Sequence, residues 1–325
     1  MDQEIPLLPF PARSQKKRRT FRQLTDQLAE NGLLAFALLP AVILAVLALV
    51  LWQRARPILQ AYPLFDLLAG TTWKPLQGSF GFLPFIAGTL WVTAAAMLLA
   101  VPPCLLTAFF LVEYAGAGLQ RLVKPLLDLL AAIPSVVYGV WGVVVIVPWV
   151  QGTLAPFFDR WLGFLPFFRQ SNPTGYGVLA GGLVLAVMVA PFIIAMTYEV
   201  LRAVPDGYRQ AALALGATRW HALRTAVVPQ VYSGILAGIV LGTSRALGET
   251  IAVLMVAGNV ATLPHSIFDP VYPLPALIAN NYGEMMSIPM YDSALLLAAL
   301  ILMGIVTLFN LLAQLFLRRI RRGVR

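Results

Sequence analysis

Six long stretches of this chain carry almost no charge, and this pattern constrains the fold more than any other feature. A bilayer core about 30 Å thick is crossed by ~20 apolar residues in a helix. Only 11% of the 325 residues are charged and 59% are hydrophobic, whereas soluble domains carry about 25% charged residues. The sequence therefore predicts an all-α integral membrane protein with six transmembrane helices, at approximately Leu33–Trp52, Phe85–Leu111, Ala131–Val150, Val178–Tyr198, Val231–Ala257 and Ser293–Leu317.

The basic residues are distributed unevenly between the two sides of these spans. Of the 23 lysines and arginines, 17 fall on the side of both termini, five on the other side, and Arg245 inside a span. Cytoplasmic loops are the ones enriched in Lys and Arg, so both termini are expected in the cytoplasm. The expected organisation is a basic N-terminal segment 1–32, a six-span membrane domain 33–317 with a cytoplasmic loop 199–230, and a basic tail 318–325. Attraction to anionic membrane lipid accounts for the formal charge of +9 without a nucleic-acid partner.

Several kinds of chemistry are missing from the chain. Cys104 is the only cysteine, and the two histidines, His221 and His265, fall in loops on opposite sides of the membrane. A histidine-based catalytic dyad or a metal site is therefore not expected, and neither is a cofactor. The chain has no Walker-type phosphate-binding loop, so ATP hydrolysis by that route would require a partner subunit. An intramembrane enzyme is a poor alternative, and a non-catalytic subunit is expected.

The fourth loop contains a helix, a glycine turn and a second helix. Its sequence runs from Gln210 through Ala211 and Ala212 to Gly216, and after nine residues reaches Ala-Val-Val-Pro229. Small alanines allow another surface to approach closely, Gly216 permits a sharp bend, and Pro229 is expected to end the second helix near the membrane. The alternative is an interfacial amphipathic helix that has no partner.

The fifth span carries three glycines and two charges on one helical face. At 100° per residue, Gly234, Gly238, Gly242, Arg245 and Glu249 fall within a sector of about 80°. The glycines should allow a neighbouring helix to approach closely, and the i, i+4 spacing should bring Arg245 and Glu249 together. An arginine inside a span is a functional-site hypothesis by default, although the pair could also be purely structural.

The fourth loop resembles the EAA loop of ABC importer permeases, which reads E-A-A-x3-G-x9-I-x-L-P. Gln210, Ala226 and Val228 depart from that pattern, and the spacing is intact. The resemblance implies a MetI-like permease architecture in which this loop forms a coupling helix. In that role Gln210, Ala211, Ala212, Gly216 and Pro229 would contact an ATPase subunit.

The fifth span resembles phosphate importer permeases of the PstC type in the segment Arg245-Ala-Leu-Gly-Glu-Thr-Ile-Ala-Val253. The segments Trp73-Lys-Pro75 and Ile133-Pro-Ser-Val-Val-Tyr-Gly139 agree with it. The resemblance implies a multi-pass subunit of the bacterial plasma membrane. Its partners would be a second permease of the PstA type, an ATPase dimer and an extracytoplasmic phosphate-binding protein. Arg245 would line the phosphate path near the bilayer midplane, with Glu249 holding its guanidinium. A PstA-type identity and another oxyanion (molybdate, sulfate or phosphonate) are the alternatives.

Overall fold

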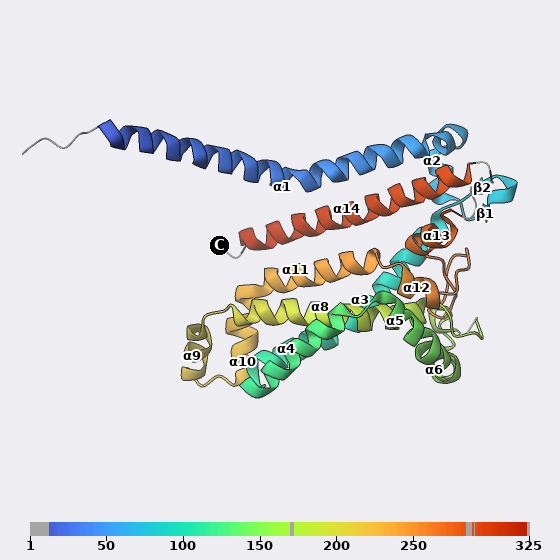
Figure 1. Ribbon diagram of the computed structural model, residues 1–325. Coiled ribbons are helices and arrows are strands. Elements are labelled where there is room, and N and C mark those ends of the chain that lie inside the picture. The colour runs from blue at the N-terminus through green and yellow to red at the C-terminus, as the bar shows by residue number, and fades with distance from the viewer. Residues whose placement is uncertain (1–12, 170–171, 284–287, 289, 324–325) are drawn as a thin grey trace, which may run out of the picture. The chain divides into compact units, whose positions relative to one another are not determined.

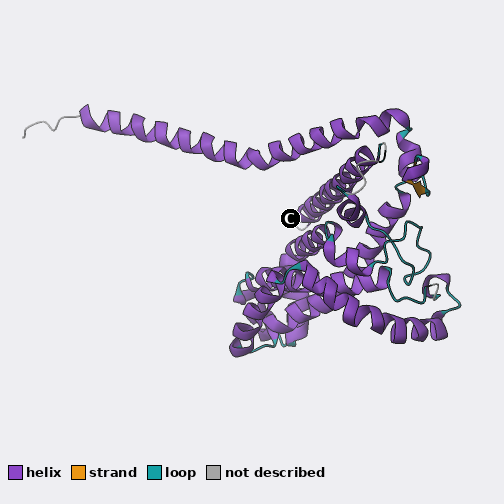
Figure 2. Ribbon diagram, turned by 45° about the vertical axis from the view of Figure 1, so that its right-hand side comes forward, coloured by secondary structure: helices purple, strands orange, loops and turns teal. Residues whose placement is uncertain are grey.

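The computed structural model describes residues 13–169, 172–283, 288 and 290–323. The described chain is almost entirely helical (Figure 2). Its α-helices and strands are α1 Arg13–Ala61, α2 Leu64–Ala69, β1 Trp73–Lys74, β2 Ser79–Phe80, α3 Leu83–Glu113, α4 Ala117–Ala132, α5 Ser135–Trp141, α6 Val147–Trp149, α7 Ala155–Leu162, α8 Val178–Arg202, α9 Asp206–Ala214, α10 Arg219–Ala222, α11 Val228–Leu247, α12 Ile251–Val256, α13 Leu274–Asn281 and α14 Tyr291–Gly323.

The chain divides into two units, and each is described by itself. The first is Met1–Gln53 and contains most of the long helix α1, which passes residue 32 without a break. Residues 1–12 of the expected N-terminal segment and 324–325 of the expected tail lie outside the described residues. The second unit, Arg54–Arg325, contains every other helix and both strands.

In the part of the chain that the structure describes, six helical segments are long and apolar enough to cross a membrane, as the sequence predicts. They are Ala29–Ala61, Leu83–Glu113, Ser135–Leu162, Val178–Arg202, Arg219–Leu247 and Tyr291–Arg319. The third and fifth differ most from the expected ranges, and a backbone break, which hydropathy does not register, sets the start of the third and the end of the fifth. Ile133 is extended, with φ −63° and ψ 129°, because the ring of Pro134 disfavours the helical conformation of the preceding residue. The third span therefore begins at Ser135.

Among the described residues, three π-helical segments precede prolines at which the helix continues. They are Gly142–Ile146, Val150–Leu154 and Leu223–Val227, and each is followed two residues after its end by a proline: Pro148, Pro156 and Pro229. A proline in a helix interior lacks an N–H and clashes with the carbonyl of residue i−4. A π turn moves that carbonyl out of the regular register, so the helix continues past the proline.

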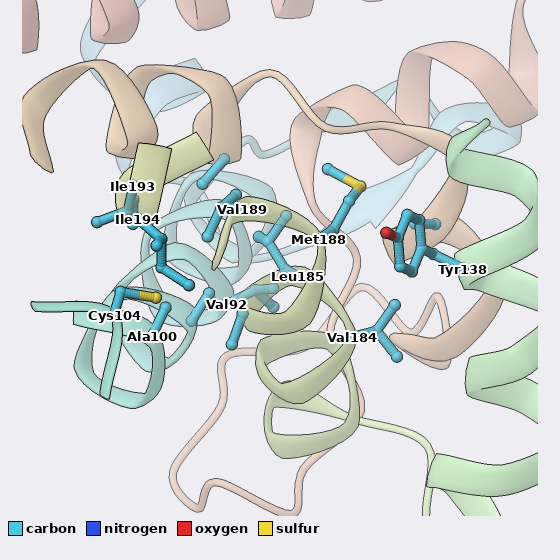
Figure 3. Packing of buried hydrophobic residues seen from close by; sticks show 14 of the residues in the cluster. Val92, Ala100, Cys104, Tyr138, Val184, Leu185, Met188, Val189, Ile193 and Ile194 are labelled. Carbon is cyan, nitrogen blue, oxygen red and sulfur yellow. The ribbon is translucent and has the colours of Figure 1, made fainter. Parts of the chain in front are cut away.

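The core of the second unit forms where α3 crosses α8, the most extensive helix–helix contact in the described chain. Figure 3 shows Val92, Ala100 and Cys104 of α3 packed close to α8 residues such as Ile193 and Ile194. A Cβ added to Gly182 of α8 would lie 2.8 Å from the Cβ of Ala95, so the two backbones come close there.

A second buried cluster joins the end of α1 to α13 and α14. Trp73 of β1 lies at its edge, with ring centroids 4.9 Å from Phe85 and 5.9 Å from Tyr291. The backbone N–H of Leu274 donates to Thr89 Oγ1 at 2.9 Å and fixes α13 against α3. Within the second unit, α8, α11 and α14 run alongside one another, with α9 and α10 at one end and the β1–β2 hairpin at the other (Figure 1).

Candidate functional site

Arg245 lies in the last turn of α11, because that helix ends at Leu247. It is 17 residues from the first residue of α11, or about 26 Å along the axis at 1.5 Å per residue. Its side chain is exposed in the single chain.

The expected pairing of Arg245 with Glu249 does not form. In the described chain, salt bridges join Lys124 to Glu199 and Arg209 to Glu113 and Asp206. The i, i+4 argument assumed one continuous helix, but α11 stops before Gly248 and α12 starts only at Ile251. Glu249 instead accepts a hydrogen bond from the backbone N–H of Ala252 at 3.3 Å, where its carboxylate stabilises the first turn of α12.

The three glycines of α11 pack against a single stripe of α8, as the sequence predicts for a neighbouring helix. An added Cβ would lie 2.6 Å from Val200 Cγ1 at Gly234, 3.2 Å from Met196 Cβ at Gly238 and 2.9 Å from Ile193 Cγ1 at Gly242. These neighbours run backwards along α8 as the glycines run forwards along α11, so the two helices are antiparallel. Gly238 and Gly242 are buried, whereas Arg245 is exposed.

A second helix break lies beside the first. Helix α5, which starts after Pro134, packs against α12, which starts after the break at Gly248. An added Cβ on Gly139 would lie 2.5 Å from Met255 Sδ, and one on Gly142 would lie 2.7 Å from Val256 Cγ1. Two interrupted helices therefore meet inside the membrane domain, an arrangement that transporters use at substrate sites.

Tyr138 lies between these two breaks and was not singled out by the sequence as a site residue. It is buried, and its hydroxyl donates to the carbonyl of Leu130 at 2.8 Å. The hydrogen bond spans the α4–α5 break. The only signal in the sequence was its place in the segment Ile133–Gly139.

The arrangement at Arg245 favours recognition of an anion. An ionised arginine facing lipid at this depth costs roughly 2.5–3.5 kcal/mol on insertion scales, so its guanidinium is expected to meet water, a ligand or another chain. Arginine presents a planar fork of donors that matches the oxygens of an oxyanion.

The fourth loop has the expected helix, turn and helix geometry. Helix α9 ends at Ala214, Gly216 adopts φ +82°, and α10 begins at Arg219. An added Cβ on Gly216 would meet nothing within 4 Å, so the positive φ, and not crowding, favours glycine there. Gln210 and Ala211 are exposed and Ala212 is half-buried, which leaves the face of α9 open to another molecule.

Pro229 does not end the second helix, contrary to the expectation. It lies in the first turn of α11, and the helical path runs from Arg219 to Leu247. The reason is the π segment before it, in which the N–H of Val228 bonds to the carbonyl of Leu223, five residues earlier.

The sequence did not single out one strongly exposed apolar side chain in this loop. Leu215 follows α9 directly and is 90% exposed. It lines a surface groove of about 520 Å³ together with Ala212, Gly216, Ala217, Thr218, His221 and Thr225. Exposure of this kind depends on the turn at Gly216, so the sequence pattern alone does not single out Leu215.

Residues 105–322 match the family described as binding-protein-dependent transport system inner membrane component. The chain is 39% identical over 291 residues to a protein of Xylella fastidiosa named phosphate transport system permease protein PstC, covering 89% of this chain and 88% of that one. It is 35% identical over 316 residues to the protein of the same name from Mesorhizobium japonicum, covering 96% of both.

The fold is similar to that of a chain in the crystal structure of a bacterial ABC transporter involved in the import of the acidic polysaccharide alginate. The TM-score is 0.57 at 17% identity, covering 91% of this chain and 99% of the other. The identity is low, so this likeness concerns the fold alone. With the match over 105–322 and the relatives that span nearly the whole chain, the protein belongs to the binding-protein-dependent transport system inner membrane components, and among them to the PstC-type permeases.

Proposed function

We propose that this chain is the PstC-type permease subunit of an ATP-driven importer for inorganic phosphate. The observation that carries the proposal is its 39% identity, over 89% of its length, to a relative named phosphate transport system permease protein PstC. The family consists of membrane components of transport systems, so the chain is a transport subunit and not an enzyme. Import of another oxyanion is not favoured, because relatives from several organisms carry the phosphate name.

The proposed partners follow from this assignment. A second permease of the PstA type would complete the membrane path, two ATPase subunits would bind on the cytoplasmic side, and a phosphate-binding protein would deliver substrate from outside. Both termini would be cytoplasmic, as the distribution of basic residues indicates. ATP binding and hydrolysis in the partners would move the permease pair between inward-open and outward-open states.

Arg245 is proposed to line the phosphate path. Its exposure in the single chain and its position next to two helix breaks support this role. The role proposed for Glu249 changes with its geometry, because its carboxylate stabilises the start of α12 and so holds the break in place.

The coupling role is proposed for α9 and the turn that follows it. Exposed Gln210 and Ala211, half-buried Ala212 and the positive φ of Gly216 form the surface that an ATPase subunit would contact, with Leu215 in the adjoining groove. Pro229 would act indirectly, by fixing the path from α10 into α11.

The test is reconstitution of the complete complex in liposomes with its binding protein. Radiolabelled phosphate should accumulate only when ATP is supplied, and excess sulfate or molybdate should leave the uptake unchanged. The substrate assignment would be contradicted if excess molybdate or sulfate suppressed the uptake while excess unlabelled phosphate left it unchanged.

A further inference from the structure

Arg209 of α9 makes four polar contacts that leave it mostly buried at the surface of the second unit. Its Nε donates to Glu113 Oε1 at 2.7 Å, and its Nη1 donates to Asp206 Oδ1 at 3.2 Å and to the carbonyl of Val204 at 3.3 Å. Its Nη2 donates to the carbonyl of Leu201 at 3.2 Å. One guanidinium therefore uses all three of its nitrogens.

These contacts join α9 to α8, which precedes it directly in the sequence, and to α3, whose Glu113 lies 96 residues before Arg209. Glu113 is the last residue of α3, Leu201 lies in the last turn of α8, and Val204 follows that helix by two residues. The last carbonyls of a helix lack regular intrahelical partners. A cation at the C-terminus of a helix is also favoured by the helix dipole. Arg209 thus attaches α9 to the ends of α3 and α8, the two helices that share the largest contact in the core.

Burial distinguishes this contact from the other ion pair between helices at the same end of the unit. The side chains of Arg209 and Glu113 are 16% and 8% exposed, whereas those of Lys124 and Glu199 are 56% and 53% exposed. An exposed pair contributes little, because solvent screens it. Removal of one partner from a buried pair leaves an uncompensated charge and is strongly unfavourable.

A hydrogen-bonded network next to Arg209 extends the connection to α4. Arg202 Nη1 donates to the Tyr198 hydroxyl at 3.0 Å, which donates to Gln120 Oε1 at 3.1 Å. Gln120 Nε2 donates to the carbonyls of Leu111 and Ala115 at 2.9 and 3.0 Å. Glu113, Gln120, Tyr198, Arg202 and Arg209 surround a polar cavity of about 310 Å³.

We infer that Arg209 is a positioning residue for coupling: it transmits movement of α9 to α3 and α8 when an ATPase subunit moves the loop. The inference rests on the proposed contact between α9 and the ATPase. Besides Arg209, α9 is joined to α8 by residues 203–205 and to α10 by the turn at Gly216, where a glycine with φ +82° and open space around it permits bending. Without Arg209, part of a movement of α9 would be absorbed in these connections.

The experiment measures phosphate uptake and ATP hydrolysis in the same liposomes that hold the complete complex. In Arg209→Ala, phosphate imported per ATP hydrolysed should fall at least about fivefold, the lower range of typical coupling between sites, while hydrolysis continues. Glu113→Gln keeps the shape of the side chain and should shift the ratio in the same direction, which covers the case in which Arg209→Ala does not assemble. Arg209→Lys keeps the charge without the fork and should give an intermediate ratio.

Lys124→Ala is the matched control. It breaks the exposed ion pair between Lys124 and Glu199, in which Nζ lies 2.6 Å from Oε1, at the same end of the unit. Its ratio should stay within about twofold of the wild type, as the small contribution of exposed pairs implies. Uptake and hydrolysis that fall together in Arg209→Ala and Glu113→Gln, so that the ratio is unchanged, would show a merely structural role and overturn the inference. A wild-type complex without ATP-driven phosphate uptake would instead overturn the proposed function.

Discussion

Arg245 is exposed near the end of a helix that breaks inside the membrane domain, so its guanidinium is available to a ligand. Glu249 is engaged elsewhere, because its carboxylate accepts a hydrogen bond from the backbone N–H of Ala252. Because no carboxylate in the described chain forms a salt bridge with Arg245, an anion that enters the path would not have to displace one.

Replacement of Arg245 by Lys tests whether the planar fork matters. Lys keeps the charge but offers a compact ammonium, so phosphate uptake should fall by at least about tenfold, equivalent to ~1.4 kcal/mol, while the complex still assembles. Uptake is measured in liposomes, and assembly by co-purification of the other subunits. The control is Arg160→Lys, an exposed arginine of α7. Equal uptake by both variants would remove Arg245 from the substrate path.

Leu215 is expected to anchor the ATPase. Leu215→Ala should weaken binding of the ATPase subunit by more than about 1 kcal/mol, as truncation of an interface hot spot does. It should change the permease's own free energy of unfolding by less than about 0.5 kcal/mol, since its side chain is exposed. The control is Leu76→Ala. Leu76 is 85% exposed and lies in the connection between β1 and β2, at the other end of the unit. The affinity is measured by titrating the purified permease pair with the ATPase subunit. Equal affinities for the Leu215→Ala and Leu76→Ala variants would contradict the prediction.

At this scale the sequence identified residues more reliably than their contacts. The glycine stripe follows from residue spacing, because a helix repeats regularly. The pairing of Arg245 with Glu249 did not follow, because the helix between them is interrupted. Arg209 was one basic residue among many on its side, and only the folded ends of α3 and α8 give it partners.

At the scale of helices, the contact of α11 with α8 depends on the absence of side chains. Gly242→Val would place a Cβ 2.9 Å from Ile193 Cγ1, and such overpacking typically costs about 1–3 kcal/mol. The thermal unfolding temperature of the purified permease should therefore fall. Gly304→Val is the matched control, because an added Cβ on that α14 glycine meets nothing within 4 Å. Equal unfolding temperatures for the two variants would mean that the α8–α11 contact adjusts freely.

The π segment before Pro229 makes a different prediction. In Pro229→Ala the residue regains an N–H, so Leu223–Val227 can relax into α-helix. With the number of residues unchanged, that relaxation would rotate α9 and α10 about the axis of α11 by about 100°. ATP-dependent uptake should fall, and cysteine crosslinking between α9 and the ATPase should change pattern. Pro156→Ala, which follows the π segment Val150–Leu154 away from the loop, is the control and should leave both unchanged.

Helix existence was predictable and helix continuity was not. A long uncharged window shows that a segment is apolar enough to lie in lipid. Each of the six windows of the sequence overlaps a long apolar helical segment of the described chain. Hydropathy does not depend on which backbone groups are hydrogen-bonded. The expected third and fifth spans therefore ran through Pro134 and Gly248, where the helices of the structure break. Proline in turn was expected to end a helix at Pro229, whereas the π turn lets the helix continue.

For the whole molecule, the distribution of charge predicts the orientation in the membrane. Reporter fusions at Lys17 and after Arg325 should both report cytoplasm, because 17 of the 23 basic residues lie on that side. A fusion at Leu76, in the loop between the first two spans, should report the opposite side. A non-cytoplasmic signal at either terminal fusion would contradict the topology, and with it the placement of α9 next to an ATPase.

The three π segments also bear on how the chain tolerates changes in length. Each contains one residue more than an α-helix needs over the same path, since its hydrogen bonds reach five residues back. Loss of one residue from an ordinary span would turn everything beyond it by about 100° and face the wrong side chains toward lipid. Loss of one residue from Gly142–Ile146, Val150–Leu154 or Leu223–Val227 would instead restore regular register and keep both flanking faces in place. These segments are therefore where homologous chains of different length should align with single-residue gaps.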